Sequence, residues 1–110
     1  VFTRGASGGV PPGVEHRLGD RRADLSALDR GTWDAVVDTC GYLPAEVRAL
    51  AARLQGRVGR CLFVSSQSVY ASSVRGNTED DPVGTIDDPE TTTVDGRTYG
   101  PLKALCEAEV

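Results

Sequence analysis

Residues 33–64 contain an apolar run, then apolar residues at helical spacing, and then a second apolar run. Trp33 to Thr39 is rich in β-branched residues and nearly continuous, which is typical of a strand buried in a parallel sheet. Pro44 suits the first turn of a helix. Behind it, apolar residues recur at helical spacing: Val47, Leu50, Ala51, Leu54 and Val58. Gly59 ends this pattern, and Cys61 to Val64 forms the second apolar run. The order strand, helix, strand predicts a βαβ unit.

The segments on either side extend the alternation of strands and helices. Val1 to Thr3 is predicted to end a strand, and a loop rich in glycine and proline runs from Gly5 to Gly13. Apolar residues alternate with polar ones from Val14 to Leu18, which predicts a short strand. Asp24 is predicted to cap a short helix that carries Leu25 and Leu28.

A long polar segment precedes the last predicted helix. From Ala71 to Arg97 no periodicity is visible, and loops of this length inside a domain are usually functional. Thr98 is expected to cap a final helix with an apolar stripe of Leu102, Leu105 and Cys106. The whole pattern predicts an α/β fold with a doubly wound parallel sheet.

Composition excludes several classes of protein. A chain of 110 residues provides one domain. The formal charge is −4 and the arginines are scattered among carboxylates, which argues against a nucleic-acid partner. No apolar run reaches the roughly 20 residues of a membrane span and no signal peptide is recognised, so a cytoplasmic protein is expected. The three cysteines and the single His16 fit neither a zinc site nor a disulfide framework, so no metal is expected.

Two residues of the last predicted helix could carry acid–base chemistry. Tyr99 and Lys103 are four residues apart, which places them on one helix face, and Lys103 is the only lysine in the chain. A phenol has a pKa of about 10, and a neighbouring cation favours its ionised form. The alternative is a solvated lysine beside a packed tyrosine.

A pair of serines follows the second apolar run. Ser65 and Ser66 stand where a strand is predicted to end, and open α/β sheets bind ligands at the carboxyl ends of their strands. The hydroxyl of Ser66 could therefore bind a substrate oxygen. The alternative is that polar turn residues simply terminate the strand.

Together, these motifs resemble the extended short-chain dehydrogenase/reductase family of epimerases and dehydratases. A strand, Ser-Ser-x-x-Val-Tyr, a long loop and Tyr-Gly-x-x-Lys follow one another in that order. The resemblance implies a Rossmann-like NAD(P)-binding domain over residues 1–110, with Ser66, Tyr99 and Lys103 as catalytic residues. It also implies cofactor contacts, and the residues concerned are Asp20, Thr39, Cys40, Gly41 and Lys103.

Two departures from the family pattern qualify this expectation. The Gly-rich turn after a first strand is absent, because the cluster Gly5 to Gly9 is followed by prolines and not by a helix. Arg4 occupies the strand tip where an acidic residue would select NAD, and an arginine there favours the 2′-phosphate of NADP.

Both ends of the sequence look like cuts within a domain. The chain lacks methionine, opens on Val1-Phe2 and stops at Val110 inside a helical pattern. We therefore expect an internal piece of the domain, without the first strand, its Gly-rich turn or the C-terminal substrate part. Such a piece is expected to fold poorly and to be inactive by itself.

The function that the resemblance implies is hydride transfer between NAD(P) and a hydroxyl or carbonyl carbon. The expected partner is a small molecule, a nucleotide sugar being the commonest for the pattern, and a homodimer is considered as the assembly. The rival hypothesis is a non-catalytic relative that binds RNA or senses dinucleotides. The presence of all three of Ser66, Tyr99 and Lys103 favours the enzyme.

Overall fold

The computed structural model describes residues 1–6, 8–72 and 76–110 of an elongated molecule that measures 43 × 27 × 26 Å. Ser7 of the predicted glycine-rich loop and residues 73–75 of the predicted polar loop lie outside the described residues. The elements, in chain order, are β1 (Phe2–Thr3), β2 (Arg17–Leu18), the 3-10 helix η1 (Ser26–Leu28), β3 (Trp33–Asp38), α1 (Pro44–Leu54), β4 (Val58–Phe63), the 3-10 helix η2 (Gln67–Val69) and α2 (Tyr99–Glu107).

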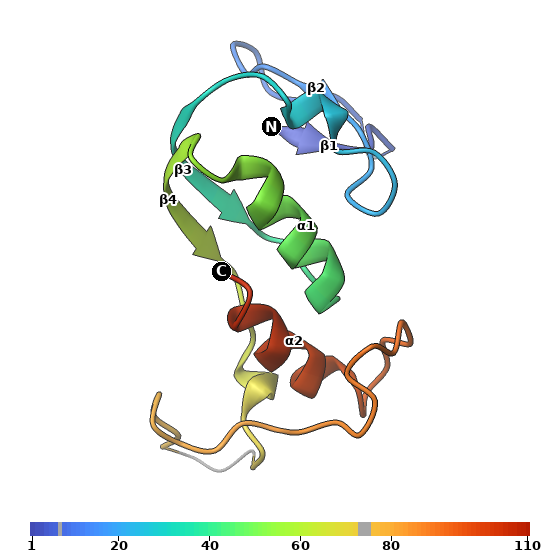
Figure 1. Cartoon of the computed structure of the whole chain (residues 1–110), viewed down its shortest axis with the longest axis vertical. Helices are drawn as coiled ribbons and strands as arrows, with labels where there is room; N and C mark the ends of the chain where they lie inside the picture. The colour runs from blue at the N-terminus through green and yellow to red at the C-terminus, as the bar shows by residue number, and fades with distance from the viewer. Residues whose placement is uncertain (7, 73–75) are drawn as a thin grey trace.

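The central unit is formed by β3, α1 and β4 (Figure 1). The two strands pair in parallel, in a register that runs from Trp33 opposite Val58 to Asp38 opposite Phe63. Helix α1 crosses between them and begins at Pro44, as the sequence predicts. The chain turns back after α1 at Gly56, whose φ of +73° is readily adopted only by glycine. Strand β4 therefore starts earlier than predicted, and Val58 belongs to it rather than to the helix.

The predicted doubly wound sheet is wrong for this chain. The strands form two separate two-stranded parallel sheets, one of β1 and β2 and the other of β3 and β4. No third strand joins either pair within the described residues. Among the described residues between η2 and α2, the only pairing of β type is an isolated bridge of Tyr70 to Val83.

The prediction that the run from Trp33 to Thr39 is a buried strand is also wrong, since Asp38 is the one buried residue of β3. Helix α1 covers one face of the β3–β4 pair, and the opposite face remains open. As a result the side chains of Val37 and Leu62, which lie opposite each other in the register, are 56% and 60% exposed. A two-stranded sheet with one helix has apolar surface that this fold does not cover.

Helix α2 packs below the central unit, against η2 and the start of α1 (Figure 1). Leu102 and Cys106 of its predicted stripe are fully buried. Thr98 occupies the position before the helix, but its hydroxyl donates to the Thr93 carbonyl and makes no cap hydrogen bond to α2. None of the helices among the described residues is long and apolar enough to cross a membrane.

Candidate functional site

The candidate site lies where the parallel strands β3 and β4 end side by side. Asp38 and Phe63 are the last residues of the two strands and lie opposite each other. From there the chain continues into Thr39–Leu43 on one side and into Val64–Ser66 on the other. Helix α2 packs on η2 and α1, and its Lys103 reaches the segments that follow the two strands.

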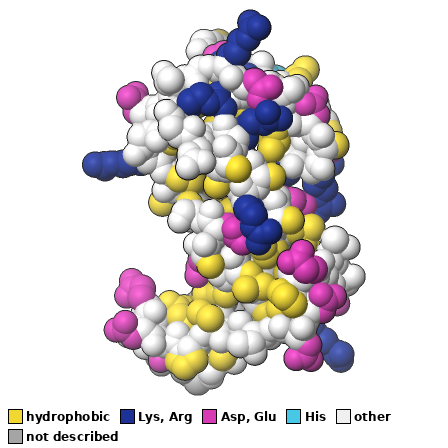
Figure 2. Space-filling view, viewed as in Figure 1, with side chains coloured by type: hydrophobic (Ala, Val, Ile, Leu, Met, Phe, Trp, Pro, Cys, Tyr) yellow, Lys and Arg dark blue, Asp and Glu magenta, His cyan; other side chains and the backbone are white. Residues whose placement is uncertain are grey.

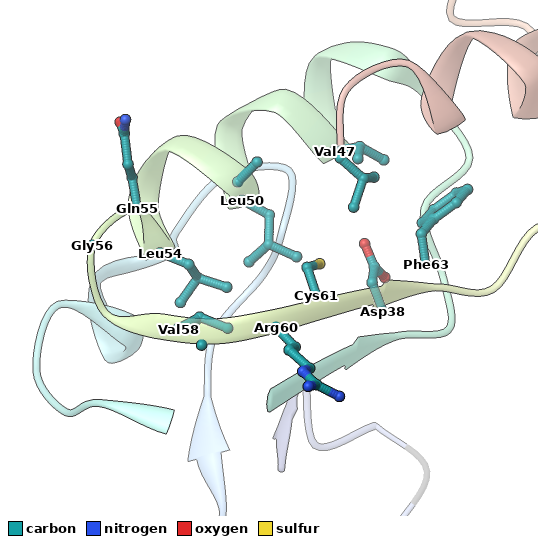
Figure 3. A pocket seen from close by; sticks show the side chains of 13 residues that line it. Asp38, Val47, Leu50, Leu54, Gln55, Gly56, Val58, Arg60, Cys61 and Phe63 are labelled. Atoms are coloured by element: carbon teal, nitrogen blue, oxygen red, sulfur yellow. The ribbon is translucent and has the colours of Figure 1, made fainter. Parts of the chain in front are cut away.

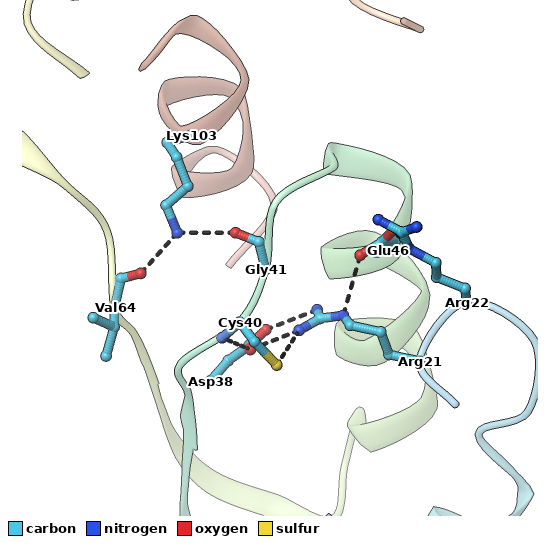
Figure 4. A network of polar contacts seen from close by, with 8 residues as sticks. All are labelled: Arg21, Arg22, Asp38, Cys40, Gly41, Glu46, Val64 and Lys103. Carbon is cyan, nitrogen blue, oxygen red and sulfur yellow. Dashed lines mark hydrogen bonds and ion pairs between the residues drawn. The ribbon is translucent and has the colours of Figure 1, made fainter. Parts of the chain in front are cut away.

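Lys103 occupies the centre of this region. It is 2% exposed, and its Nζ donates hydrogen bonds to the carbonyl oxygens of Gly41, at 2.9 Å, and Val64, at 2.7 Å (Figure 4). These two carbonyls belong to the segments that follow β3 and β4. An ammonium group has three N–H donors, so one donor remains without an acceptor among the described residues. A buried ammonium is costly unless it is hydrogen-bonded, and Lys103 therefore ties α2 to both strand ends.

Two aromatic rings flank the same ammonium group. The Lys103 Nζ lies 3.8 Å from the centre of the Phe63 ring and 5.9 Å from the centre of the Tyr42 ring. The electron-rich faces of such rings attract a cation, and the attraction is strongest where water is excluded. Tyr42 also contacts Tyr99, with a distance of 6.3 Å between the ring centres.

Ser66 and Tyr99 are held at the same end of the sheet by the contact between η2 and α2. Ser66 caps η2, and its Oγ accepts a hydrogen bond from the backbone N–H of Ser68 at 3.1 Å. Tyr99 is the first residue of α2, and Gly100 beside it lies against the backbone of Ser68. The structure thus brings together the elements that carry Ser66, Tyr99 and Lys103. The neighbouring Ser65 Oγ is buried and has no hydrogen-bond partner among the described residues.

A second group of polar side chains lies beside the lysine and is called here the Arg21 cluster. Its members are Arg21, Arg22, Asp38, Cys40 and Glu46 (Figure 4). The Arg21 guanidinium donates to both Asp38 oxygens, at 2.8 and 2.9 Å, and to the Cys40 sulfur at 3.3 Å. It lies 3.4 Å from Glu46, which also pairs with Arg22 at 2.7 Å. The cluster connects the loop after β2 to β3 and α1.

The Arg21 cluster controls the charge of Asp38. Burial alone would raise the pKa of this carboxyl group. Hydrogen bonds from Arg21 and from the backbone N–H of Cys40 outweigh that effect and hold the pKa below its ordinary value. Asp38 is therefore ionised at neutral pH and compensates the positive charge of Arg21.

The residues expected to bind the cofactor fall into three groups. Gly41 lies at the lysine, and Cys40 lies in the Arg21 cluster. The Asp20 carboxylate accepts a hydrogen bond from the backbone N–H of Arg22 at 2.9 Å, so it is next to the cluster. Thr39 is exposed beside it. Arg4 is exposed at the end of β1, in the separate β1–β2 sheet, and the structure does not bring it to the lysine.

Sequence reasoning missed Arg21, Glu46 and the aromatic residues around Lys103. One pattern could have indicated the Arg21 cluster, because Asp38 is a carboxylate at the end of an apolar strand. A carboxylate in such a place is almost never buried without a partner. Nothing comparable indicated Phe63, which reads as an ordinary core residue.

An apolar cavity of about 190 Å³ lies on the helix-covered face of the sheet (Figure 3). Val47, Leu50 and Leu54 of α1 form one wall, and β4 forms the other with Val58 and Cys61. The cavity shares Asp38 and Phe63 with the lysine site. Its lining offers few polar groups to orient a ligand.

The described residues contain no group of three His, Cys, Asp or Glu side chains that could hold a metal ion. Comparison of the chain with protein-family models, with curated proteins and with solved structures gives no match.

Proposed function

We propose that the protein is an NAD(P)-dependent oxidoreductase that uses Ser66, Tyr99 and Lys103 on a hydroxyl or carbonyl substrate. The observation that carries the proposal is the position of Lys103. The only lysine of the chain is buried at the end of two parallel strands, four residues after Tyr99 on the same helix. The proposal rests on these residues and not on a doubly wound sheet.

Each of the three side chains has a role that its position supports. Tyr99 gives a proton to the reacting oxygen, or takes it away, through its phenol group. Lys103 is a fixed positive charge nearby, because two backbone carbonyls hold its ammonium in one place. Ser66 binds the reacting oxygen of the substrate with its hydroxyl, which is carried on the segment next to Val64.

The cofactor proposed is a nicotinamide dinucleotide whose ribose lies at Lys103. The third N–H of Lys103 is the group proposed to contact a ribose hydroxyl. Asp20 is proposed to contact the adenine end, and Thr39, Cys40 and Gly41 are proposed to contact the cofactor between the two ends. When bound, the dinucleotide would supply or accept the hydride. Arg4 is proposed to favour the 2′-phosphate of NADP, because its guanidinium is exposed at the end of β1.

The substrate proposed is a small molecule of the nucleotide-sugar kind, as for the epimerases and dehydratases that the motifs resemble. Carboxylates surround the lower part of the molecule, whereas the arginines gather mostly on its upper part (Figure 2). An even basic surface for a nucleic-acid backbone is not seen on this face.

The first experiment measures binding of NADPH and NADH to the full-length protein by calorimetric titration. We expect micromolar binding that weakens about 10- to 100-fold in Lys103→Met, since a charge-assisted hydrogen bond is lost. Arg30→Met removes an exposed cation elsewhere and is expected to leave binding unchanged. Lys103→Arg tests whether a cation alone is sufficient. A wild-type protein that binds neither dinucleotide would show that the proposal is wrong.

A further inference from the structure

Phe63 is in closer contact with the ammonium of Lys103 than the other aromatic residues. It is the last residue of β4, and its ring centre lies 3.8 Å from the Lys103 Nζ. Figure 3 shows the ring directed to the helix-covered side of the sheet, near Val47 of α1. The ring therefore lies between the end of the sheet and the first turn of α1.

The backbone at Gly41 leaves the space that this ring occupies. A Cβ atom at residue 41 would lie 2.6 Å from the Phe63 Cε2 and 2.6 Å from the Val47 Cγ2. Both distances are too short for carbon atoms in contact. The carbonyl oxygen of the same Gly41 accepts one of the hydrogen bonds of Lys103. Phe63, Gly41 and Lys103 are thus packed as one interlocked group.

We propose that Phe63 is a positioning residue for Lys103, and that its ring face and the Gly41 carbonyl together fix where the ammonium points. The inference rests on the proposed function, in which Lys103 serves Tyr99 and the ribose. Hydrogen bonds to Gly41 and Val64 set two directions of the ammonium group, and the centre of the Phe63 ring lies 3.8 Å from its nitrogen. Because Lys103 is almost fully buried, its ammonium group is largely removed from water, and its attraction to the Phe63 ring is therefore stronger than at an exposed site.

The test compares Phe63→Leu, which keeps an apolar side chain but removes the ring face, with Phe63→Tyr, which keeps the ring. Phe2→Leu is the matched control, since Phe2 is the only other phenylalanine and lies in β1. NMR spectra of protein with ¹³C-labelled lysine report on Lys103, whose signal is identified by its loss in Lys103→Arg. We expect an upfield ring-current shift of the Lys103 Hε protons in wild type, Phe63→Tyr and Phe2→Leu. The shift should disappear in Phe63→Leu.

Acylation of Lys103 and turnover provide the second and third readouts. In Phe63→Leu, acylation of Lys103 should become about 30-fold faster and kcat/KM about 30-fold lower, the size expected for a desolvated cation–π contact. Phe63→Tyr should restore both values. An unchanged Lys103 signal and acylation rate in Phe63→Leu would overturn the inference. So would full turnover in Phe63→Leu despite a displaced Lys103 signal. If the Lys103 signal moves as expected but no variant and no wild type turns over a substrate, the contact stands and the proposed function fails.

A second variant tests the same group from the backbone side. Gly41→Ala should move the ring and abolish the upfield shift of Lys103, because its Cβ would overlap Phe63. Gly96→Ala is the control, since no atom lies within 4 Å of a Cβ at that position. A normal Lys103 signal in a folded Gly41→Ala protein would contradict the interlocked arrangement.

Discussion

Gly100 lies directly against the carbonyl oxygen of Ser68, so the first turn of α2 meets η2 with no side chain of residue 100 between them. The contact has a functional consequence, since η2 follows Ser66 and α2 begins at Tyr99. A larger residue at position 100 would push Tyr99 away from the serine.

Gly100→Ala is therefore expected to destabilise the protein. Replacing glycine by alanine inside a helix normally stabilises it by about 0.5–1 kcal/mol. Here a Cβ would overlap the Ser68 carbonyl oxygen, and overpacking of this kind costs about 1–3 kcal/mol or more. Urea denaturation should show a lower free energy of unfolding for Gly100→Ala and no loss for Gly96→Ala. Equal or higher stability of Gly100→Ala would show that η2 and α2 do not pack in this way.

The pairing of Asp38 with Arg21 predicts a specific loss of stability in acid. The pKa of Asp38 is lower in the folded chain than its ordinary value, despite burial, because Arg21 and the Cys40 N–H bind the carboxylate. Its contribution is thus fully present above the unfolded pKa of about 4 and is lost as the pH falls through the folded value. Asp38→Asn should lower stability by about 3 kcal/mol at pH 7, as expected when one partner of a buried pair is removed. The difference from wild type should shrink below about pH 4.

Asp34→Asn, an exposed carboxylate of the same strand, is the control for this titration. It should follow the wild-type curve of unfolding free energy against pH. A difference between Asp38→Asn and wild type that stays constant from pH 7 to acid would contradict the pairing.

The three free cysteines are expected to react at different rates with a thiol reagent. Cys40 is exposed, and Cys61 is exposed on β4 although partial burial raises the pKa of its thiol. Cys106 is fully buried in α2, and burial raises the pKa of its thiol to about 11. Colorimetric titration of the native protein should give two reactive thiols, Cys40 and Cys61, with Cys61 the slower because burial raises the pKa of its thiol. The third should react only after unfolding, and rapid reaction of all three would contradict the burial of Cys106.

Arg4→Ala should weaken the binding of NADPH and not that of NADH if Arg4 contacts the 2′-phosphate. Losing charge-assisted bonds to that phosphate costs about 1.5–3 kcal/mol, or about 10- to 100-fold in affinity. NADPH binding should weaken by this factor and NADH binding should be unchanged, as measured by calorimetry. An equal effect on both would mean that Arg4, exposed at the end of β1, is a surface residue without a role in selectivity.

The local elements could be predicted from the sequence to a useful extent. The apolar run from Trp33 predicted β3 to within one residue. The stripe behind Pro44 predicted where α1 begins, but the helix stops at Leu54, earlier than predicted. The error at Val58 arose because an apolar residue at helical spacing also suits a strand, and Gly56 rather than Gly59 makes the turn. Periodicity alone does not distinguish these alternatives.

The assembly of the strands could not be predicted in the same way. A strand pattern does not say which edges pair, and here β1–β2 and β3–β4 remain separate sheets. They are connected instead by Arg21, whose partners Asp38 and Cys40 are far from it in sequence. Of the site, the spacing of Tyr99 and Lys103 was visible in the sequence. The carbonyls and the ring that hold Lys103 depend on the packing of three elements and carried no local signature.

NAD(P)H-dependent turnover in Tyr99→Phe and Tyr70→Phe tests most directly whether Tyr99 is the catalytic acid or base. Of the three tyrosines of the chain, only Tyr99 shares a helix face with Lys103, and Tyr70 provides the matched control. Absorbance of the reduced cofactor is followed in the full-length protein with a panel of nucleotide sugars. We expect Tyr99→Phe to lower kcat by about 10²- to 10⁴-fold, the usual effect of a positioned acid or base, while NADPH still binds. Tyr70→Phe should behave as wild type. Wild-type turnover in Tyr99→Phe would contradict the account.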